Sequence, residues 1–100
     1  MVSKGILAIT IARPGREAEL EAFLASALTL AEQEPGTIAW FAIKIDDRTY
    51  GIFDVFEDEA GRQAHLNGPI AAGLMAKSDE LLSQPPDLKM IDVVAGKLPS

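Results

Sequence analysis

The segment that decides the fold of this chain reads Phe56-Glu57-Asp58-Glu59-Ala60-Gly61-Arg62-Gln63-Ala64-His65-Leu66-Asn67-Gly68-Pro69. Its first residue ends an apolar run, its acidic residues precede and cap a short helix that starts at Asp58, and the Asn-Gly-Pro ending stops that helix after Leu66. The segment also carries the only histidine of the chain, His65. It therefore predicts a strand that ends at Phe56, an acidic turn and a short helix over residues 58–66.

The residues before this segment predict a strand, a helix and a β-hairpin. A β-branched run over residues 6–11 is typical of a strand, and Pro14 suits the start of a helix. From Arg16 to Ala31 apolar residues recur at helical spacing, until Pro35-Gly36 ends the helix. Strands over Thr37–Ile45 and Tyr50–Phe56 follow, joined by a polar turn at residues 46–49.

The residues after the segment predict a second, longer helix and a last strand. The helix extends over Ile70–Leu82, Pro85-Pro86 stops it, and Leu88–Ala95 forms the fourth strand. The order is β-α-β-β-α-β, with the second helical part in two pieces. This order predicts a single α+β domain over residues 1–100, with a ferredoxin-like, four-stranded antiparallel sheet and helices on one face only.

The hairpin turn determines which side chains face the helices. A two- or four-residue loop around Asp47-Arg48 would place Ile43 opposite Ile52 and Phe41 opposite Asp54. Side chains alternate along a strand, so the face that carries Asp54 would hold Phe41, Ile43, Tyr50, Ile52 and Phe56. The opposite face would hold Trp40, Ala42, Lys44, Gly51, Phe53 and Val55. A three-residue loop with a bulge would break this register.

Composition narrows the classes of partner. The net charge of −6, from 15 acidic against 9 basic residues, repels phosphate backbones and anionic lipid, which excludes nucleic acid and membrane surfaces as expected partners. The chain has no cysteine and one histidine, so we expect neither a transition-metal site nor a disulfide. Residues 1–5 are too few and too polar for a signal peptide, and we expect a cytoplasmic protein.

One face of the predicted sheet has no helix to cover it. The strands are nonetheless apolar on both faces, and 48% of all residues are hydrophobic. A large exposed apolar patch is unusual on a soluble monomer. We therefore expect a homodimer in which Trp40, Phe53 and Val55 on the uncovered face contact a second subunit.

Two side chains are the candidates for chemistry. His65 is the one group whose ordinary pKa lies near neutrality, which makes it the first choice for proton transfer. Asp54 lies between Phe53 and Val55 in an apolar strand, and a buried carboxylate needs a partner. If Asp54 faces the helices, His65 or Arg62 would be that partner. Structural alternatives are a packing or capping role for His65 and a register-fixing role for Asp54.

The aromatic residue, acidic turn, short helix and histidine of residues 56–65 resemble the antibiotic biosynthesis monooxygenase family. In that family a tryptophan and an acidic turn precede an alanine-histidine-leucine helix, and here Ala64-His65-Leu66 occupy the helix. The resemblance extends along nearly the whole chain and implies a dimeric α+β barrel, in which two sheets pair face to face. It also implies an oxygenase without metal, flavin or other cofactor, in which a phenol or hydroquinone reacts directly with O₂.

The resemblance implies a site on the helix side of the sheet. The match of His65 to the family's helix histidine makes it the expected catalytic base, and Asp54, from its place in the apolar strand, is the expected catalytic partner; the substrate implied is a small phenolic or quinonoid aromatic compound. The residues expected to bind that compound are Phe41, Tyr50, Ile52, Phe56 and Arg62.

The chain also departs from the family pattern. Quinone-forming members use a tryptophan, an asparagine and a tyrosine at positions that correspond to Phe56, Ile52 and Arg62 here. Haem-degrading relatives carry a tryptophan at the position of His65 and a histidine ligand at the position of Met75, so haem degradation is not expected. Two hypotheses remain open: a cofactor-independent oxygenase or isomerase, and a non-catalytic dimeric module that binds a small ligand in the same cleft.

Overall fold

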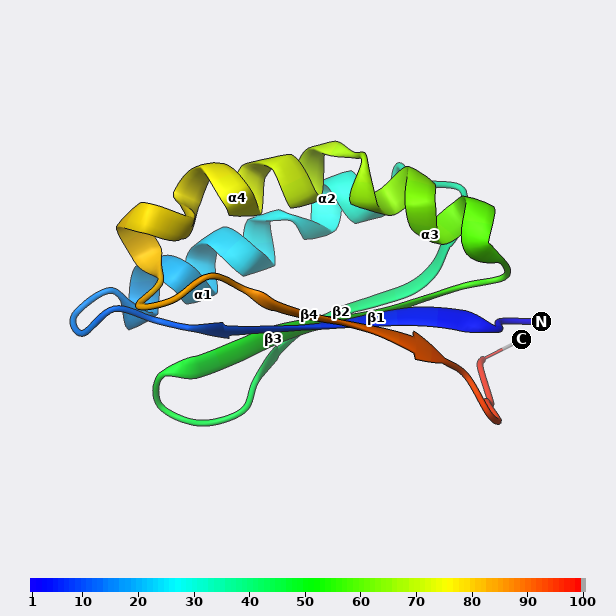
Figure 1. Ribbon diagram of the computed structural model, residues 1–100, viewed down its shortest axis with the longest axis horizontal. Helices are drawn as coiled ribbons and strands as arrows, with labels where there is room; N and C mark the ends of the chain where they lie inside the picture. Colours follow the sequence, from blue (N-terminus) through cyan, green and yellow to red (C-terminus); the bar gives the residue numbers. More distant parts are fainter. Residues whose placement is uncertain (100) are drawn as a thin grey trace.

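The computed structural model describes residues 1–99 and contains one antiparallel sheet with helices on a single face (Figure 1). The elements in chain order are β1 (Lys4–Ile11), α1 (Glu17–Ser26), α2 (Leu28–Ala31), β2 (Thr37–Lys44), β3 (Thr49–Phe56), α3 (Glu59–Leu66), α4 (Pro69–Leu81) and β4 (Asp87–Asp92). The sheet has four strands in the order β2-β3-β1-β4, and every neighbouring pair is antiparallel. This arrangement confirms the predicted α+β, ferredoxin-like class.

The core lies between the sheet and the helices. It is formed by apolar side chains from the helix-facing side of β1 and β3 and from the inner faces of α1, α2 and α4. Its buried members are Ala8, Ala12, Leu20, Leu24, Ala27, Ala31, Tyr50, Ile52, Ile70, Leu74, Leu81 and Leu82. The Thr10 hydroxyl, which is buried among them, donates to the Tyr50 carbonyl oxygen at 2.9 Å. Within residues 1–99 no helix is both long and apolar enough to cross a bilayer.

The turn and helix after β3 form as their residues predict. The Asp58 side chain caps α3 by accepting a hydrogen bond from the Gly61 backbone N–H at 3.0 Å. The helix ends after Leu66, and Pro69 takes the first position of α4, where its missing N–H costs nothing. The short helix α3 is therefore held over the end of β3.

The first helical region and the last strand differ from the prediction. The single helix expected over residues 16–31 is divided at Ala27, whose N–H bonds to Leu24 three residues back, and the Ser26 hydroxyl binds the Phe23 carbonyl. Leu28 consequently leaves the core and is 48% exposed. The last strand ends at Asp92 rather than Ala95: its pairing with β1 stops at Lys4 and Asp92, and one further backbone hydrogen bond follows, from the Val93 N–H to the Ser3 carbonyl oxygen at 2.9 Å.

The predicted hairpin register is wrong by one residue. The Asp46 carboxylate accepts hydrogen bonds from the backbone N–H groups of Arg48 and Thr49, at 3.0 and 2.8 Å, and closes a three-residue loop. Trp40 therefore lies opposite Asp54 and packs against the core, whereas Phe41 lies opposite Phe53 on the uncovered face. Phe41 is 53% exposed.

The uncovered face of the sheet is mainly apolar on β1, β2 and β3, whereas β4 places Asp87 and Lys89 on it beside Ile91. Figure 1 shows this face on the side away from the helices. The register places on it the side chains of Leu7, Ile9, Ile11, Phe41, Ile43, Phe53 and Ile91, all of them exposed or half-buried. The apolar patch expected there exists, but Phe41 and Ile43 take the place expected for Trp40, and Val55 is buried.

Two helical glycines should respond in opposite directions to alanine. At Gly73 in α4 an added Cβ meets only the Phe23 ring at 3.5 Å, so Gly73→Ala should raise the free energy of unfolding by up to about 1 kcal/mol. At Gly61 in α3 the Cβ would lie 3.0 Å from the backbone oxygen of Gly36, so Gly61→Ala should lower the free energy of unfolding. Urea unfolding of the two variants measures the difference, and an equal gain in both would show that the contact between Gly36 and Gly61 is loose.

Candidate functional site

His65 lies in the last turn of α3 with a carboxylate at each ring nitrogen. Its Nε2 is 3.0 Å from Asp54 Oδ2, and its Nδ1 is 2.7 Å from Glu34 Oε1. Asp54 is 1% exposed and His65 7%. The three side chains thus form a buried carboxylate–imidazole–carboxylate cluster, and the juxtaposition of Asp54 and His65 expected from the topology is present.

Three separate elements supply the cluster. Asp54 projects from the helix face of the inner strand β3, and the imidazole of His65 packs over Phe56 two residues along that strand, with ring centroids 5.5 Å apart. Glu34 comes from the loop between α2 and β2, where the Thr37 hydroxyl donates to its Oε1 at 2.7 Å. That loop approaches α3 closely because Gly36 and Gly61, which lack side chains, are in backbone contact.

The two carboxylates stabilise the charged form of the histidine. Burial lowers the pKa of His65, but the interactions with Asp54 and Glu34 outweigh this effect and raise the pKa to about 8. His65 is therefore mainly an imidazolium at pH 7, with a carboxylate oxygen 2.7 Å from its Nδ1 and another 3.0 Å from its Nε2.

Asp54 retains unused acceptor capacity. Its contact with His65 has the distance of an ion pair without the direction of a hydrogen bond, and within residues 1–99 neither of its oxygens has a hydrogen-bond partner. A buried carboxylate in this condition is costly, and a hydrogen-bond donor that reached it would relieve part of that cost.

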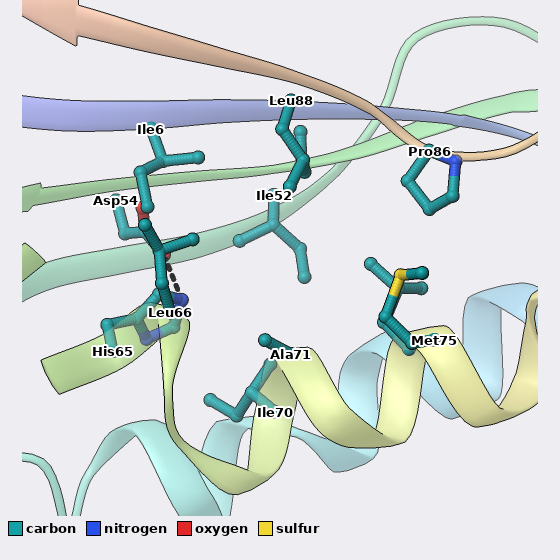
Figure 2. A pocket seen from close by; sticks show the side chains of 12 residues that line it. Ile6, Ile52, Asp54, His65, Leu66, Ile70, Ala71, Met75, Pro86 and Leu88 are labelled. Carbon is teal, nitrogen blue, oxygen red and sulfur yellow. Dashed lines mark ion pairs between the residues drawn. The ribbon is translucent and has the colours of Figure 1, made fainter. Parts of the chain in front are cut away.

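The cluster forms one end of a cavity between the sheet and the helices α3 and α4. Figure 2 shows Asp54 and His65 at that end and Met75 and Pro86 at the other. The cavity has a volume of about 60 Å³ and is otherwise apolar. It is lined by Ile6, Ala8, Ile52, Asp54, His65, Leu66, Ile70, Ala71, Leu74, Met75, Pro86 and Leu88.

The structure separates the residues that were expected to bind the substrate. Ile52 lines the cavity, and Phe56 lies beneath His65, fully buried. Tyr50 is on the helix face but lines a different hollow, beside Glu21 and Lys44. The placement of Phe41 in the cleft is wrong, because the one-residue change of register turns its side chain to the uncovered face.

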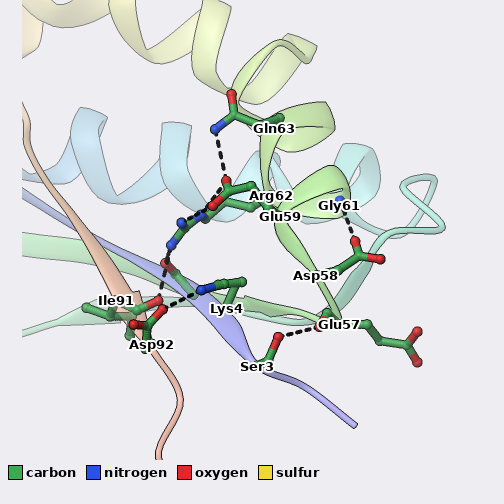
Figure 3. Close-up of polar contacts among 11 residues, drawn as sticks. Ser3, Lys4, Glu57, Asp58, Glu59, Gly61, Arg62, Gln63, Ile91 and Asp92 are labelled. Carbon is green, nitrogen blue, oxygen red and sulfur yellow. Dashed lines mark hydrogen bonds and ion pairs between the residues drawn. The ribbon is translucent and has the colours of Figure 1, made fainter.

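Arg62 does not pair with Asp54. Its guanidinium binds Glu59 on the same helix and donates to the carbonyl oxygens of Gly5 and Ile91, at 3.2 and 3.1 Å (Figure 3). The guanidinium holds the pKa of Glu59 at about 2. Arg62 thus ties α3 to the backbones of the inner strand β1 and the edge strand β4. The expectation that it orients a ligand in the cleft has no contact to support it.

Sequence reasoning missed Glu34 and most of the apolar lining. Glu34 stands among other acidic residues at the end of a predicted helix, and no local pattern distinguishes it from Glu32. The helical spacing of Ile70 and Leu74 did indicate that these side chains face inward, but not that they border a cavity. Among residues 1–99 no group of three acidic or histidine side chains is arranged to hold a metal ion.

Solved structures show the class of this fold. A Caulobacter crescentus protein, provisionally named an antibiotic biosynthesis monooxygenase, superposes with a TM-score of 0.80 at 15% identity, over 94% of this chain and 92% of its own. A Nitrosomonas europaea protein with the same provisional name superposes with a TM-score of 0.81 at 7% identity, over 92% of this chain and 90% of its own. The chain therefore has the α+β fold of the antibiotic biosynthesis monooxygenases.

A third solved structure shows the family. A protein of unknown function from Nitrosomonas europaea is 54% identical, with a TM-score of 0.98 over 100% of this chain and 97% of its own. This chain belongs to the same family as that protein. No protein-family model matches the chain, and no curated protein matches it significantly.

The raised pKa of His65 makes stability depend on pH. Because the pKa rises from 6.5 to about 8, the contribution of His65 is fully present below pH 6.5 and is lost as pH rises through 8. A shift of this size corresponds to about 2 kcal/mol of unfolding free energy. Urea unfolding of the wild type between pH 6 and 9 should show this loss of unfolding free energy. In His65→Gln most of the pH dependence should be absent. An equal slope of unfolding free energy against pH in the wild type and in His65→Gln would contradict the assignment of this pH dependence to His65.

Proposed function

We propose that this protein is a cofactor-independent monooxygenase that acts on a small phenolic or quinonoid aromatic compound in the cavity beside Asp54 and His65. The single observation that carries the proposal is a buried carboxylate–imidazole pair at the closed end of an otherwise apolar cavity. The fold shared with proteins provisionally named as monooxygenases supports the reaction class at the level of the fold.

We assign the first proton transfer to Asp54 rather than to His65. The imidazole is already protonated near neutrality and engaged by two carboxylates, whereas Asp54 has free acceptor capacity. A phenolic hydroxyl that enters the cavity would donate to Asp54 and pass its proton to that carboxylate. The adjacent imidazolium of His65 would then stabilise the phenolate, and Glu34 would balance the imidazolium.

Proton removal prepares the ring for reaction with O₂. A phenolate is more electron-rich than the phenol and reduces O₂ more readily. In the overall reaction a phenol and O₂ give a quinone and water: one oxygen atom enters the ring and the other leaves as water. The ring supplies all the electrons, so this stoichiometry needs no added reductant, and the apolar lining would exclude bulk water from the reacting atoms.

A substrate ring requires the cavity to widen. Its volume of about 60 Å³ is less than the ~150 Å³ of an apolar cavity that admits benzene. Met75 lines the end of the cavity opposite Asp54; it is 63% exposed and has an unbranched side chain that can change rotamer at low cost. We infer that the ring enters past Met75, between α4 and the start of β4.

Asp54→Asn should abolish most turnover. Removing the proton acceptor should lower the rate by about 10²–10⁴-fold, because loss of a general base has effects of this size. His65→Gln should also lower the rate by removing the charge beside the phenolate. Oxygen consumption with a panel of phenols and hydroquinones, and quinone formation by absorbance, measure the effect.

Asp47→Asn is the matched control. It makes the same substitution in the exposed hairpin turn and should leave the rate unchanged. Full activity of Asp54→Asn would refute the assigned role.

The alternative is a non-catalytic module that binds a small aromatic molecule in the same cavity. One observation favours it: Phe56 and Ile52 stand where quinone-forming relatives have polar groups, so Asp54 and His65 are the only polar side chains at this cavity. A phenol that binds and protects the protein against unfolding, without oxygen consumption, would support this alternative.

We also propose a homodimer formed by the uncovered sheet faces. The apolar patch defined by Leu7, Ile9, Ile11, Phe41, Ile43, Phe53 and Ile91 supports it, because so wide an apolar surface is unusual on a soluble monomer. An interface made of two copies of the same face is symmetric, so the assembly is complete with two subunits.

Sedimentation at micromolar concentration should give twice the 10.7 kDa chain mass. Phe41→Glu should convert the dimer to a monomer, because it places a charge in the apolar contact. Leu28→Glu introduces the same charge at a similarly exposed apolar position on the helix side and should leave the dimer intact. A wild-type monomer at this concentration would exclude the face-to-face dimer.

A further inference from the structure

Glu34 contacts the imidazole of His65 from outside the cavity. It lies in the loop between α2 and β2, does not line the cavity, and has a side chain that is 16% exposed. Its Oε1 accepts from the Thr37 hydroxyl and is 2.7 Å from His65 Nδ1. A residue in this position can act on the cavity only through the histidine.

We propose that Glu34 is a positioning residue that holds the imidazole of His65 against Asp54 and keeps its Nδ1 protonated, so that the cluster of the three side chains works as one unit at the cavity. The inference rests on the proposed function for its effect on turnover. Its effect on the histidine is independent of any substrate.

The local packing allows Glu34 little freedom. A Cβ placed on Gly68 would lie 3.2 Å from Glu34 Oε2, so the chain after α3 passes directly over this carboxylate. The carboxylate is thus enclosed by its own loop on one side and by the end of α3 on the other. Because side chains held by packing lose little further entropy on forming a contact, the ion pair with His65 is stronger than an exposed one would be.

The geometry explains why two carboxylates are needed. An imidazole with a single carboxylate can rotate about its side-chain bonds, whereas contacts at both nitrogens fix the plane of the ring. With Glu34 at Nδ1, the Nε2 atom lies on the side of Asp54, 3.0 Å from Oδ2. A second carboxylate also supplies the charge that makes imidazolium the favoured form in a buried place.

The charged groups that face His65 come from two elements only. Asp54 on β3 and Glu34 in the loop are the charged residues whose interactions raise its pKa, and Phe56 on β3 contributes an uncharged ring. Arg62, on the same helix, is directed toward Glu59 and the backbone of β1 and β4. The response of His65 to the loss of one carboxylate can therefore be assigned to that carboxylate.

Because the chain has a single histidine, the pH titration of its imidazole protons can be followed by NMR with no need for resonance assignment. Wild-type protein should titrate with a midpoint near 8. Glu34→Gln keeps the shape and a hydrogen-bonding group but removes the charge, and should lower the midpoint by about one pH unit. Glu32→Gln removes the same charge from an exposed position two residues away and should leave the midpoint unchanged.

Two outcomes would overturn the proposal: an unchanged midpoint in Glu34→Gln, or an equal change in Glu32→Gln, which would show a general charge effect. Circular dichroism verifies that each variant is folded. If Glu34→Gln does not fold, Glu34→Asp tests the proposal instead. The shorter side chain keeps the negative charge but places it further from His65 Nδ1. A lower midpoint in Glu34→Asp supports the proposal and an unchanged one contradicts it.

Turnover, where a substrate is found, gives a second measurement. The alkaline limb of the pH–rate profile should move in Glu34→Gln by the same amount as the midpoint, with kcat lowered and KM little changed. A changed midpoint without any turnover in the wild type would refute the proposed oxygenase and leave the role of Glu34 standing. A changed KM with an unmoved midpoint would refute the role of Glu34 alone.

Discussion

The structure depends on the burial of one carboxylate, that of Asp54, in the inner strand β3. A charged group in an apolar layer is costly unless an opposite charge lies beside it, and here the imidazole of His65 is 3.0 Å away. To provide that partner, α3 must end directly over β3, which the acidic turn and the Asp58 cap accomplish. The imidazolium in turn binds Glu34, whose loop packs against α3. The backbone contact between Gly36 and Gly61, which lack side chains, makes this close approach sterically feasible.

The alternation of side chains across the sheet separates two kinds of surface. On the helix side, Asp54 is buried between the core and the small cavity. On the other side no helix covers the sheet (Figure 1), and most of the side chains that β1, β2 and β3 place there are apolar. Because neighbouring residues of one strand serve opposite faces, a single shift in strand register exchanges their environments. The hairpin loop that sets this register therefore matters for the site and for the uncovered surface together.

Local signals allowed much of the fold to be predicted. Asp58 and Pro69 have preferences that act within a few residues, and the helix boundaries around them were predicted closely. The hairpin register could not be predicted in the same way. It depends on whether the Asp46 side chain accepts from the next backbone N–H groups, and the same polar turn residues are compatible with loops of two, three or four residues. Phe41 and Trp40 were placed on the wrong faces for this reason.

The sequence by itself determined the order of elements, the α+β class and the two residues most unusual in their surroundings, Asp54 and His65. These conclusions rest on hydrophobic periodicity, capping and composition, which are properties of short segments. Only the tertiary structure decided that Glu34 completes the cluster, that Arg62 binds the backbones of β1 and β4, and that Trp40 rather than Phe41 lies on the side of Asp54. Glu34 and His65 are 31 positions apart, and contacts at such distances arise from the packing of whole elements, which no local pattern encodes.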